Sequence, residues 1–297
     1  MNETVFALPG NESLAGSLAK QLNAETGRLI LRRFPDGESY VRVESSVEDK
    51  PAIVVAALRE PDDKFLPLVF LAAALEDLGA KKIILVAPYL AYMRQDRRFK
   101  KGEAVTSTCF ARLISERFDA LVTVDPHLHR RSSLDEIYTI PSVVLHAASL
   151  ISVWIREKIE NPLLIGPDSE SEQWVKSVAE VAGAPYVVLE KVRRGDREVE
   201  ISIPHVDRWR EKTPVLVDDI ISTARTMIET VIHLKRAGMP APVCVGVHAV
   251  FAGNAYEDLL AAGAGGVYTC DTIPHRSNSI SVLPLLTGGV LYLQEKL

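Results

Sequence analysis

The chain has 297 residues, of which 47% are hydrophobic and 25% are charged. This is the composition of an ordinary globular protein with a sizeable core, and it excludes a disordered, collagen-like or coiled-coil chain. The net charge of −5 disfavours a general nucleic-acid binder, although it permits a local basic site for a small anion.

The cysteines and the N-terminal residues indicate a cytoplasmic protein. Cys109, Cys244 and Cys270 are odd in number and lack metal-ligand spacing, which favours a reducing cytosol and argues against structural zinc. Residues 1–10 lack the basic region and apolar run of a signal peptide. The longest largely apolar run, residues 65–75, is well short of the ~18 residues that a membrane helix needs. We therefore expect a soluble, cytoplasmic chain with no membrane segment.

Taken in chain order, the predicted elements repeat. Residues 5–22 have the pattern of a strand, a Pro-Gly turn and a helix, and residues 163–183 have the same pattern. The later counterparts in the two halves are residues 52–58 with 214–220, 82–89 with 243–250, and 110–125 with 255–271. Apolar strand-like stretches alternate with amphipathic helical ones throughout, which is typical of βαβ units and parallel sheets.

These elements predict an α/β protein with two similar domains in tandem, each a mostly parallel sheet flanked by helices. The expected domains are residues 1–145 and 146–297, joined near residues 141–162. Runs that are apolar throughout, such as residues 83–87, fit strands that helices cover on both faces. Chance similarity between two generic α/β halves is the alternative.

The halves differ after the strand at residues 82–89, where the first half carries an insertion around residues 94–107. Its basic residues are Arg94, Arg97, Arg98, Lys100 and Lys101, and its acidic residues are Asp96 and Glu103. A mobile basic loop in an acidic protein suits a polyanionic ligand. The alternative is a solvated surface loop, which is what most charge runs form.

The strongest local signal lies at residues 215–226. An apolar strand ends in Asp218 and Asp219, and residues 222–226 (Ser-Thr-Ala-Arg-Thr) then open a helix. Hydroxyl groups and free N–H groups at a helix N-terminus can hold a phosphate. The adjacent carboxylates can accept hydrogen bonds from sugar hydroxyls or meet Mg²⁺. The pattern therefore indicates a ribose phosphate site, with an Asp-capped helix start as the alternative.

This segment resembles the ribose-phosphate loop of type I phosphoribosyltransferases. Four further stretches, in family order, make the chain similar to the ribose-phosphate pyrophosphokinases, with archaeal-type features: residues 32–43, 87–107, 123–129 and 189–200. The resemblance covers nearly the whole chain and implies two tandem phosphoribosyltransferase-like domains. It also implies that ATP and ribose 5-phosphate react to give phosphoribosyl pyrophosphate and AMP, with Mg²⁺ as cofactor.

The resemblance implies an ATP site built from a hairpin, the basic loop and a histidine. Its residues would be Phe34, Asp36, Gly37 and Glu38 of the hairpin, Arg94, Gln95 and Asp96 of the loop, and His127. In the family the hairpin comes from a neighbouring subunit, which implies a homo-oligomer, either a dimer or a hexamer. Considered alone, Pro-Asp-Gly is first a turn signal, and a lone histidine after a strand is more often structural.

For the metal, the resemblance implies His127 and Asp168. His129, which completes the motif DPHLH, is typical of archaeal-type members. Lys191 and Arg193 lie where the first half has its hairpin, and the resemblance assigns Lys191 to transition-state stabilisation and Arg193 to ribose-phosphate contact. A cation aimed at the transferring group stabilises the charge that develops there. The alternative is a charged ribbon on the surface.

The resemblance also assigns the ribose 5-phosphate contacts, with three departures from the family pattern. Asp218 and Asp219 would hold the ribose hydroxyls, and Ser222, Thr223, Ala224, Arg225 and Thr226 would hold the 5-phosphate. Ser222 stands where the family has an acidic residue, Ala224-Arg225 replaces a Gly-Gly pair, and no Gly-Gly follows Asp168. Glycines at such places let the backbone approach a phosphate closely.

Two rival functions remain open at this stage. A base phosphoribosyltransferase that consumes phosphoribosyl pyrophosphate needs neither the repeat nor the hairpin and basic-loop motifs. A catalytically silent, nucleotide-binding paralogue that regulates a true synthase is motivated by the missing glycines. Such a copy has no chemical need for Lys191, Arg193, His127 and both aspartates together.

Overall fold

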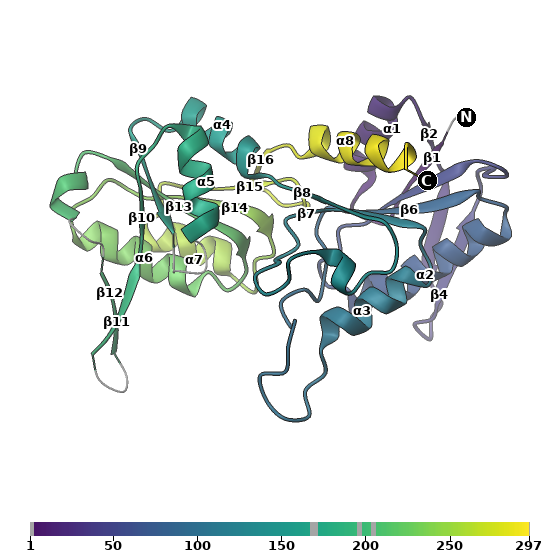
Figure 1. Cartoon of the computed structure of the whole chain (residues 1–297), viewed down its shortest axis with the longest axis horizontal. Coiled ribbons are helices and arrows are strands. Elements are labelled where there is room, and N and C mark those ends of the chain that lie inside the picture. The colour runs from purple at the N-terminus through teal and green to yellow at the C-terminus, as the bar shows by residue number, and fades with distance from the viewer. Residues whose placement is uncertain (1–2, 167–171, 195–197, 203–205, 297) are drawn as a thin grey trace. The chain divides into compact units, whose positions relative to one another are not determined.

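The structure is a computed structural model that describes residues 3–166, 172–194, 198–202 and 206–296. The chain divides into two compact units (Figure 1). Unit 1 contains the chain up to His146 together with the segment from Leu283 onward, and unit 2 contains Ala147–Val282. None of the described helices is both long enough and apolar enough to cross a lipid bilayer.

Unit 1 is built on a six-stranded sheet with the strand order β2-β1-β5-β6-β7-β8, in which every pair of neighbours is parallel. Its strands are β1 (Thr4–Ala7), β2 (Glu25–Thr26), β5 (Pro51–Val55), β6 (Lys82–Ala87), β7 (Ala120–Val124) and β8 (Ser142–Leu145). The central strands β5, β6 and β7 are buried almost throughout. This burial explains why they read as continuous apolar runs.

Helices cover both faces of this sheet. They are α1 (Glu12–Leu22), α2 (Asp62–Asp77), α3 (Thr106–Ser115) and α8 (Leu283–Gln294). Figure 1 shows α1 and α8 on one side of the sheet and α2 and α3 on the other. An antiparallel hairpin of β3 (Leu29–Arg33) and β4 (Ser39–Val43) follows β2 and packs on α2. A short 3-10 turn, Leu134–Glu136, follows β7.

Unit 2 has the same architecture, with the parallel strand order β10-β9-β13-β14-β15-β16. Its strands are β9 (Pro162–Gly166), β10 (Tyr186–Val188), β13 (Thr213–Ile221), β14 (Val243–Ala249), β15 (Gly266–Cys270) and β16 (Asn278–Ile280). Its helices are α4 (Ala148–Lys158), α5 (Glu172–Ala182), α6 (Arg225–Arg236) and α7 (Ala255–Ala262). The hairpin of β11 (Glu190–Arg194) and β12 (Glu198–Ser202) follows β10.

The predicted tandem repeat is therefore confirmed at the level of topology. In each unit the second sheet strand forms one edge of the sheet and pairs with the first, and a hairpin follows it in the chain. The remaining sheet strands then follow in chain order on the opposite side of the first strand. The first and third sheet strands of each unit (β1 and β5, β9 and β13) are the neighbours at which the strand order reverses. Ligands of open α/β sheets bind outside the carboxyl ends of the strands at such a reversal.

One segment differs from the expected division of the chain. Residues 146–297 were predicted to form the second domain, but α8 packs against α1, β7 and β8 of unit 1. The physical reason is a close approach at Gly289, where an added Cβ would lie 2.9 Å from a methyl of Val122 and 3.2 Å from one of Leu145. The helix also buries Leu286, Val290 and Leu293.

Candidate active site

The ribose-phosphate motif forms a strand, a short loop and a helix in unit 2, as predicted. β13 ends at Ile221, Ser222–Ala224 form the loop, and α6 begins at Arg225. The first N–H groups of a helix have no partner within the helix, and the helix dipole adds positive potential there. The segment after β14 contacts this loop, because the Ala252 N–H donates to the Ser222 carbonyl at 3.1 Å. The arrangement can therefore bind an anion.

Ala224, which stands where the family resemblance predicts a glycine, has an unusual backbone conformation. It is the residue before α6 and has a φ of +54°, in the left-handed region that favours glycine. Its carbonyl still accepts the N–H of Ile228 at 2.8 Å, as the residue before a helix should. An alanine therefore adopts here the left-handed turn that a glycine would adopt without strain.

The two carboxylates of the motif lie near the end of β13, where the strand pairs with β14. Asp218 is opposite Gly246 in the register, and both aspartates are half-buried. The backbone N–H of Asp219 donates to Oδ1 of Asp218 at 2.9 Å. The two carboxylates provide hydrogen-bond acceptors and the N-terminus of α6 provides N–H donors, which complements the hydroxyl donors and phosphate acceptors of a ribose phosphate.

Residues 34–38 form the tip of the β3–β4 hairpin in unit 1. The N–H of Gly37 donates to the carbonyl of Phe34 at 2.9 Å, and the N–H of Phe34 donates to the carbonyl of Glu38 at 2.8 Å. Gly37 has a φ of +94°, and Asp36 accepts the N–H of Glu38 at 3.2 Å. All five tip residues are exposed, and the Phe34 residue is 39% exposed. The tip therefore offers an aromatic ring and two carboxylates to a partner.

Arg32 is a residue of this hairpin that the sequence reasoning missed. Its guanidinium lies 4.7 Å from the ring centroid of Phe34 and 4.2 Å from that of Tyr40. The two rings meet edge-on at 5.9 Å, and the strand register pairs Arg32 with Tyr40. These cation–π contacts hold the Phe34 ring in place. The contact with Tyr40 depends on the register of the hairpin, which pairs Arg32 with Tyr40 across the two strands.

The basic loop (residues 94–105) connects β6 to α3, and its last predicted residues, 106 and 107, already belong to α3. Its two acidic side chains both contact groups of unit 1, Glu103 within the loop and Asp96 outside it. The Asp96 side chain is 5% exposed and accepts Arg130 at 3.3 Å through both oxygens. The Glu103 carboxylate accepts the N–H groups of Phe99 and Lys100 at 2.8 and 2.9 Å.

The outward charge of the basic loop is consequently positive. The five basic residues are all exposed: Arg94, Arg97, Arg98, Lys100 and Lys101. The loop is also more ordered than a plain solvated segment, since Arg98 Nε donates to the Glu103 carbonyl at 3.0 Å. Asp96 was predicted to contact ATP, and its carboxylate here contacts Arg130. The contact with ATP stays a prediction.

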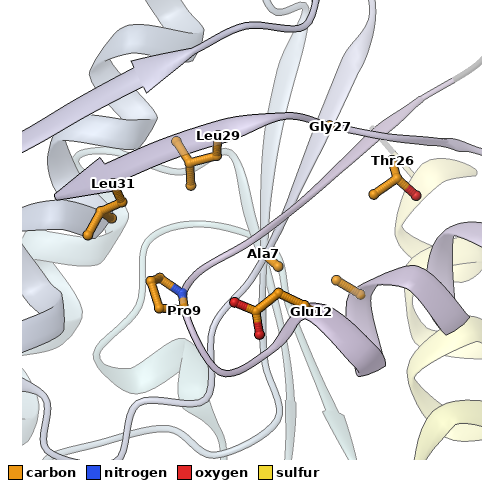
Figure 2. Close-up of a pocket in the computed structure, with 8 residues that line it drawn as sticks. Ala7, Pro9, Glu12, Thr26, Gly27, Leu29 and Leu31 are labelled. Atoms are coloured by element: carbon orange, nitrogen blue, oxygen red, sulfur yellow. The ribbon is translucent and has the colours of Figure 1, made fainter.

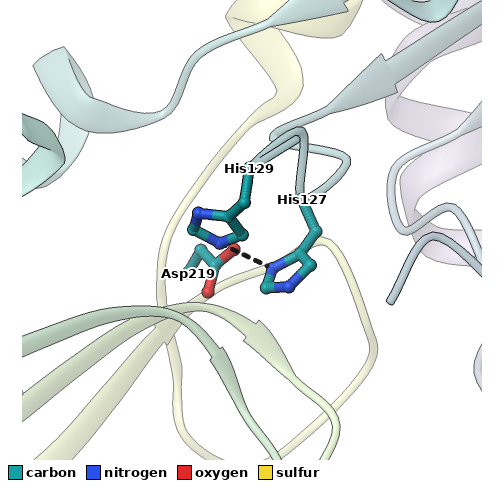
Figure 3. Close-up of side chains that lie close together, drawn as sticks. All are labelled: His127, His129 and Asp219. Carbon is teal, nitrogen blue, oxygen red and sulfur yellow. Dashed lines mark hydrogen bonds between the residues drawn. The ribbon is translucent and has the colours of Figure 1, made fainter. Parts of the chain in front are cut away.

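The DPHLH segment follows β7 and has a strained backbone. Asp125 and His127 have φ values of 34° and 58°, and the N–H of His127 donates to the Asp125 carbonyl at 2.8 Å. The two imidazoles meet through His127 Nδ1 and His129 Nε2, which are hydrogen-bonded at 3.1 Å (Figure 3). The sequence motif therefore presents a pair of imidazoles instead of one.

His146, the residue after β8, forms a hydrogen bond with Asp125 of this segment. This contact was not predicted from the sequence. Nδ1 of His146 lies 3.0 Å from Oδ1 of Asp125, whose side chain is only 8% exposed. The hydrogen bond that the His146 ring donates to Asp125 raises the pKa of His146, against an opposing effect of partial burial. The sequence offers no separation pattern that would connect residues 125 and 146, because the contact depends on β7 pairing with β8.

The remaining predicted site residues are only partly described. In the hairpin of unit 2, Lys191 pairs with Ile201 and Arg193 pairs with Val199 in the antiparallel register. This hairpin follows β10 as the β3–β4 hairpin follows β2, as the sequence comparison predicted. Asp168 lies outside the described residues, and its place in the chain is directly after β9 (Pro162–Gly166).

A cavity of about 320 Å³ in unit 1 lies apart from these residues. Figure 2 shows it between the start of α1 and the β3 strand, with Glu12 at its edge. Its lining residues are Ala7, Pro9, Glu12, Ala15, Thr26, Gly27, Leu29 and Leu31. None of the predicted site residues lines it, so the cavity has no part in the site described above.

Comparison with known proteins places these features in a family. A family model for the N-terminal domain of ribose phosphate pyrophosphokinase matches residues 4–117, and one for the phosphoribosyl transferase domain matches residues 133–290. Ribose-phosphate pyrophosphokinase of Methanopyrus kandleri is 37% identical over 96% of this chain and 98% of its own length. The chain belongs to the ribose-phosphate pyrophosphokinase family.

Other relatives agree with this assignment. Ribose-phosphate pyrophosphokinase of Methanosarcina acetivorans is 35% identical over 95% of this chain and 97% of its own length. The crystal structure of phosphoribosylpyrophosphate synthetase from Mycobacterium smegmatis superposes on the whole chain with a TM-score of 0.87 at 25% identity, and all of that chain is covered. The resemblance to the ribose-phosphate pyrophosphokinases, their archaeal members included, and the predicted fold class are confirmed.

The family implies Mg²⁺, and the donor atoms present suit it only in part. Mg²⁺ prefers oxygen ligands, keeps several waters and is bound through one or two carboxylates plus substrate phosphates. His127 and His129 offer nitrogen, and Asp125 is already bonded to His146. These residues therefore fit an ion that the phosphates of a nucleotide hold, with His127 as a single nitrogen ligand or as a partner of a metal-bound water.

Proposed function

We propose that this ribose-phosphate pyrophosphokinase family member transfers the diphosphoryl group of ATP to the 1-hydroxyl of ribose 5-phosphate, yielding phosphoribosyl pyrophosphate and AMP. The observation that carries the proposal is the β13–α6 connection, in which two half-buried aspartates precede an open helix N-terminus. Among the described residues, this segment combines acceptors for sugar hydroxyls with donors for a phosphate.

The sugar phosphate would be held by unit 2. Asp218 and Asp219 accept hydrogen bonds from the ribose hydroxyls, and the backbone and hydroxyl groups of residues 222–226 hold the 5-phosphate at the start of α6. Such contacts fix the 1-hydroxyl in a position from which it can attack. The protein's contribution is then positioning and electrostatics, because phosphoryl transfer needs little covalent help from side chains.

The nucleotide would be held by elements of unit 1. The exposed Arg94 can donate two parallel hydrogen bonds to a phosphate, and the adjacent Gln95 would also contact ATP. The Phe34 ring at the hairpin tip, braced by Arg32, is a surface on which a base can stack. Asp36, Gly37 and Glu38 complete the tip and would contact the base or ribose of ATP. The basic loop would cover the phosphates and exclude water.

Magnesium and the charged hairpin of unit 2 would act on the transferring group. Bound Mg²⁺ would supply positive charge that offsets part of the negative charge of the phosphates. His127 would hold it as described above, together with Asp168. Lys191 is proposed to stabilise the charge that develops in the transition state, and Arg193 to contact the ribose phosphate.

An oligomer is part of the proposal. The tip of the β3–β4 hairpin and the basic loop project from different places of unit 1 (Figure 1), although both are assigned to the ATP site. A hairpin tip supplied by a second copy resolves this mismatch, so we propose a homo-oligomer, a dimer or a hexamer. A cytoplasmic location is supported by three free thiols, Cys109, Cys244 and Cys270. No nucleic-acid or membrane partner is proposed.

The test is AMP formation from ATP and Mg²⁺, with and without ribose 5-phosphate, while phosphorus NMR follows phosphoribosyl pyrophosphate. AMP and phosphoribosyl pyrophosphate that appear together, and only with the sugar present, would support the synthase. ATP that protects the chain from unfolding without any turnover would instead support the silent regulatory paralogue. Consumption of added phosphoribosyl pyrophosphate with a purine or pyrimidine base would support the base phosphoribosyltransferase.

A further inference from the structure

Arg131 connects the segment after His129 to the base of the basic loop, all within unit 1. One terminal nitrogen of its guanidinium donates to the carbonyl oxygen of Asp96 at 3.2 Å and to Oγ1 of Thr108 at 3.2 Å. The same nitrogen lies 3.4 Å from Oγ of Ser107, at the start of α3. A single side chain therefore contacts the loop just after Arg94 and Gln95 and also the helix that ends the loop.

The surroundings of Arg131 are unusual for a surface arginine. Its side chain is 15% exposed, and its Nε is buried with no hydrogen-bond partner among the described residues. Its second terminal nitrogen lies 3.6 Å from a carboxylate oxygen of Glu136, which Ser132 holds in place through its N–H and its hydroxyl. Burying a charged group among mostly neutral acceptors is costly. Stability alone would be served as well by an apolar residue.

Arg130 contacts Asp96 as well, through the side chain of that residue. It contacts both oxygens of Asp96 at 3.3 Å, while Arg131 takes the backbone carbonyl of that residue. Gln95 is fixed from the other side, since its carbonyl accepts the N–H of Ser107 at 3.3 Å and its side-chain oxygen accepts the hydroxyl of Thr106 at 3.3 Å. The junction exists because β6 and β7 are parallel neighbours, so the segments that follow them emerge at one edge of the sheet.

We propose that Arg131 is a positioning residue for the nucleotide: it fixes the backbone at Asp96 and so aims Arg94 and Gln95, without touching ATP itself. The inference rests on the proposed function only for the identity of the ligand. The anchoring of the basic loop stands on the contacts alone. A planar guanidinium can reach Asp96 and Glu136 at once, whereas a lysine offers one compact ammonium group. Arg131→Lys should therefore keep the anchor in part.

The first arm of the test measures anchoring without any substrate. Trypsin cleaves after Arg97, Arg98, Lys100 and Lys101, which are all exposed. Limited proteolysis of the full-length protein should cut this stretch about tenfold faster in Arg131→Gln than in the wild type, and at an intermediate rate in Arg131→Lys, because local opening exposes cleavage sites. Arg117→Gln, a change at an exposed arginine after α3, is the control and should cleave at the wild-type rate. Equal cleavage of Arg131→Gln and the wild type would overturn the anchor.

The second arm measures the nucleotide. Arg131→Gln should raise the KM for ATP about 10-fold to 100-fold, since small misplacement of a binding group has effects of this size, while the KM for ribose 5-phosphate stays near the wild-type value. Thr108→Val, which removes one acceptor at the helix surface, should shift the KM for ATP in the same direction by less. An unchanged KM for ATP in a variant whose loop is cut faster would overturn the positioning role.

The two arms separate this inference from the proposed function. A wild-type protein without synthase activity contradicts the proposed function, but the cleavage rates still decide whether Arg131 anchors the loop. If Arg131→Gln does not fold, Thr108→Val decides the inference through both measurements. A common shift in both KM values would contradict the inference, because a merely structural role affects both substrates.

Discussion

Ala224 stands where the family resemblance predicts a glycine, and its backbone lies in the left-handed region. A non-glycine residue in the left-handed region costs about 1–2 kcal/mol, and Ala224 has a φ of +54°. Ala224→Gly removes this strain but adds about 0.4–1 kcal/mol of conformational entropy to lose on folding. We expect the free energy of unfolding of unit 2 to rise by no more than about 1.6 kcal/mol, the difference between the two effects.

A β-branched residue at position 224 provides the comparison for the glycine variant. Ala224→Val should destabilise unit 2 by about 1–3 kcal/mol, because a branched side chain is strained at positive φ. Urea unfolding followed by tryptophan fluorescence measures both variants, since Trp154, Trp174 and Trp209 all belong to unit 2. A valine variant as stable as the glycine variant would show that the loop does not hold the left-handed turn.

His146 gives a second prediction at the scale of one residue, because its charge state is tied to Asp125. The hydrogen bond to Asp125 raises the pKa of His146 above its ordinary value. A raised pKa means that the contribution to stability is fully present below about pH 6.5, the unperturbed value, and is lost as the pH rises through the folded-state pKa. Stability of unit 1 should therefore lose this contribution from near-neutral pH upward.

The comparison that isolates this effect is wild type against His146→Gln. Glutamine can still hydrogen-bond to Asp125 but carries no charge at any pH. Urea unfolding at about pH 5.5 and about pH 8.5, on either side of the histidine's titration, should show a larger stability gap at the lower pH. The His146 side chain is 72% exposed, so solvent screens the pair and the gap will be small. An equal gap at both pH values contradicts the assignment.

Among the elements, α8 shows how a helix can be assigned to the wrong domain from sequence. Its neighbour in the chain is β16 of unit 2, and its sequence LPLLTGGVLYLQ is apolar on most sides. Such a helix has no narrow apolar stripe from which a partner can be inferred. The decisive feature is steric: Gly289 lets the helix backbone approach Val122 and Leu145, and nothing in the sequence distinguishes it from Gly288.

This pair of glycines allows a matched test of the docking. Gly288 has no atom within 4 Å of an added Cβ, so Gly288→Ala should stabilise unit 1 by about 1 kcal/mol through helix propensity. Gly289→Ala gains the same propensity but places a methyl against Val122, and overpacking typically costs about 1–3 kcal/mol. Hydrogen exchange of the β7 and β8 amides should slow in the first variant and quicken in the second. Equal exchange in both would remove the steric argument.

The elements that were predicted correctly share a reason. Buried parallel strands and amphipathic helices carry their signal locally, and the same local pattern occurs twice, so the repeat could be predicted from the sequence alone. The strand-to-helix start at Arg225 and the turn at Gly37 are likewise set by neighbouring residues. Contacts between segments that follow different strands, such as Asp96 with Arg130 or Asp125 with His146, have no local signal. They could only be found once the strand order was known.

For the whole molecule, the open question is whether one copy of the chain can build a complete ATP site. The proposed site combines the hairpin tip, with Phe34, and the basic loop, and these project from different places of unit 1 (Figure 1). If the tip serves a neighbouring copy, a defect in the tip and a defect elsewhere in the chain act on different sites of the oligomer. Two inactive variants can then complement each other.

The variants are Phe34→Ala, which removes the proposed stacking surface, and Lys191→Ala, which removes the proposed transition-state cation. Each alone should lower turnover strongly while the circular dichroism spectrum stays that of the wild type. After the two are mixed and allowed to exchange subunits, a mixed dimer has one site with an intact hairpin tip and an intact Lys191. Random assortment into dimers predicts recovery of about a quarter of the wild-type turnover.

The same mixture distinguishes the two arrangements by its concentration dependence. A site shared between two copies requires association, so the recovered turnover should fall on dilution below the concentration at which the oligomer dissociates. If the site lies within one copy, mixing the two variants should recover no turnover. Mixing either variant with itself is the control and should recover nothing. A mixture that exchanges subunits, verified by mass, yet remains inactive would place the hairpin tip and Lys191 in the site of a single chain. The proposed contribution of Phe34 to a neighbour would then have to be given up.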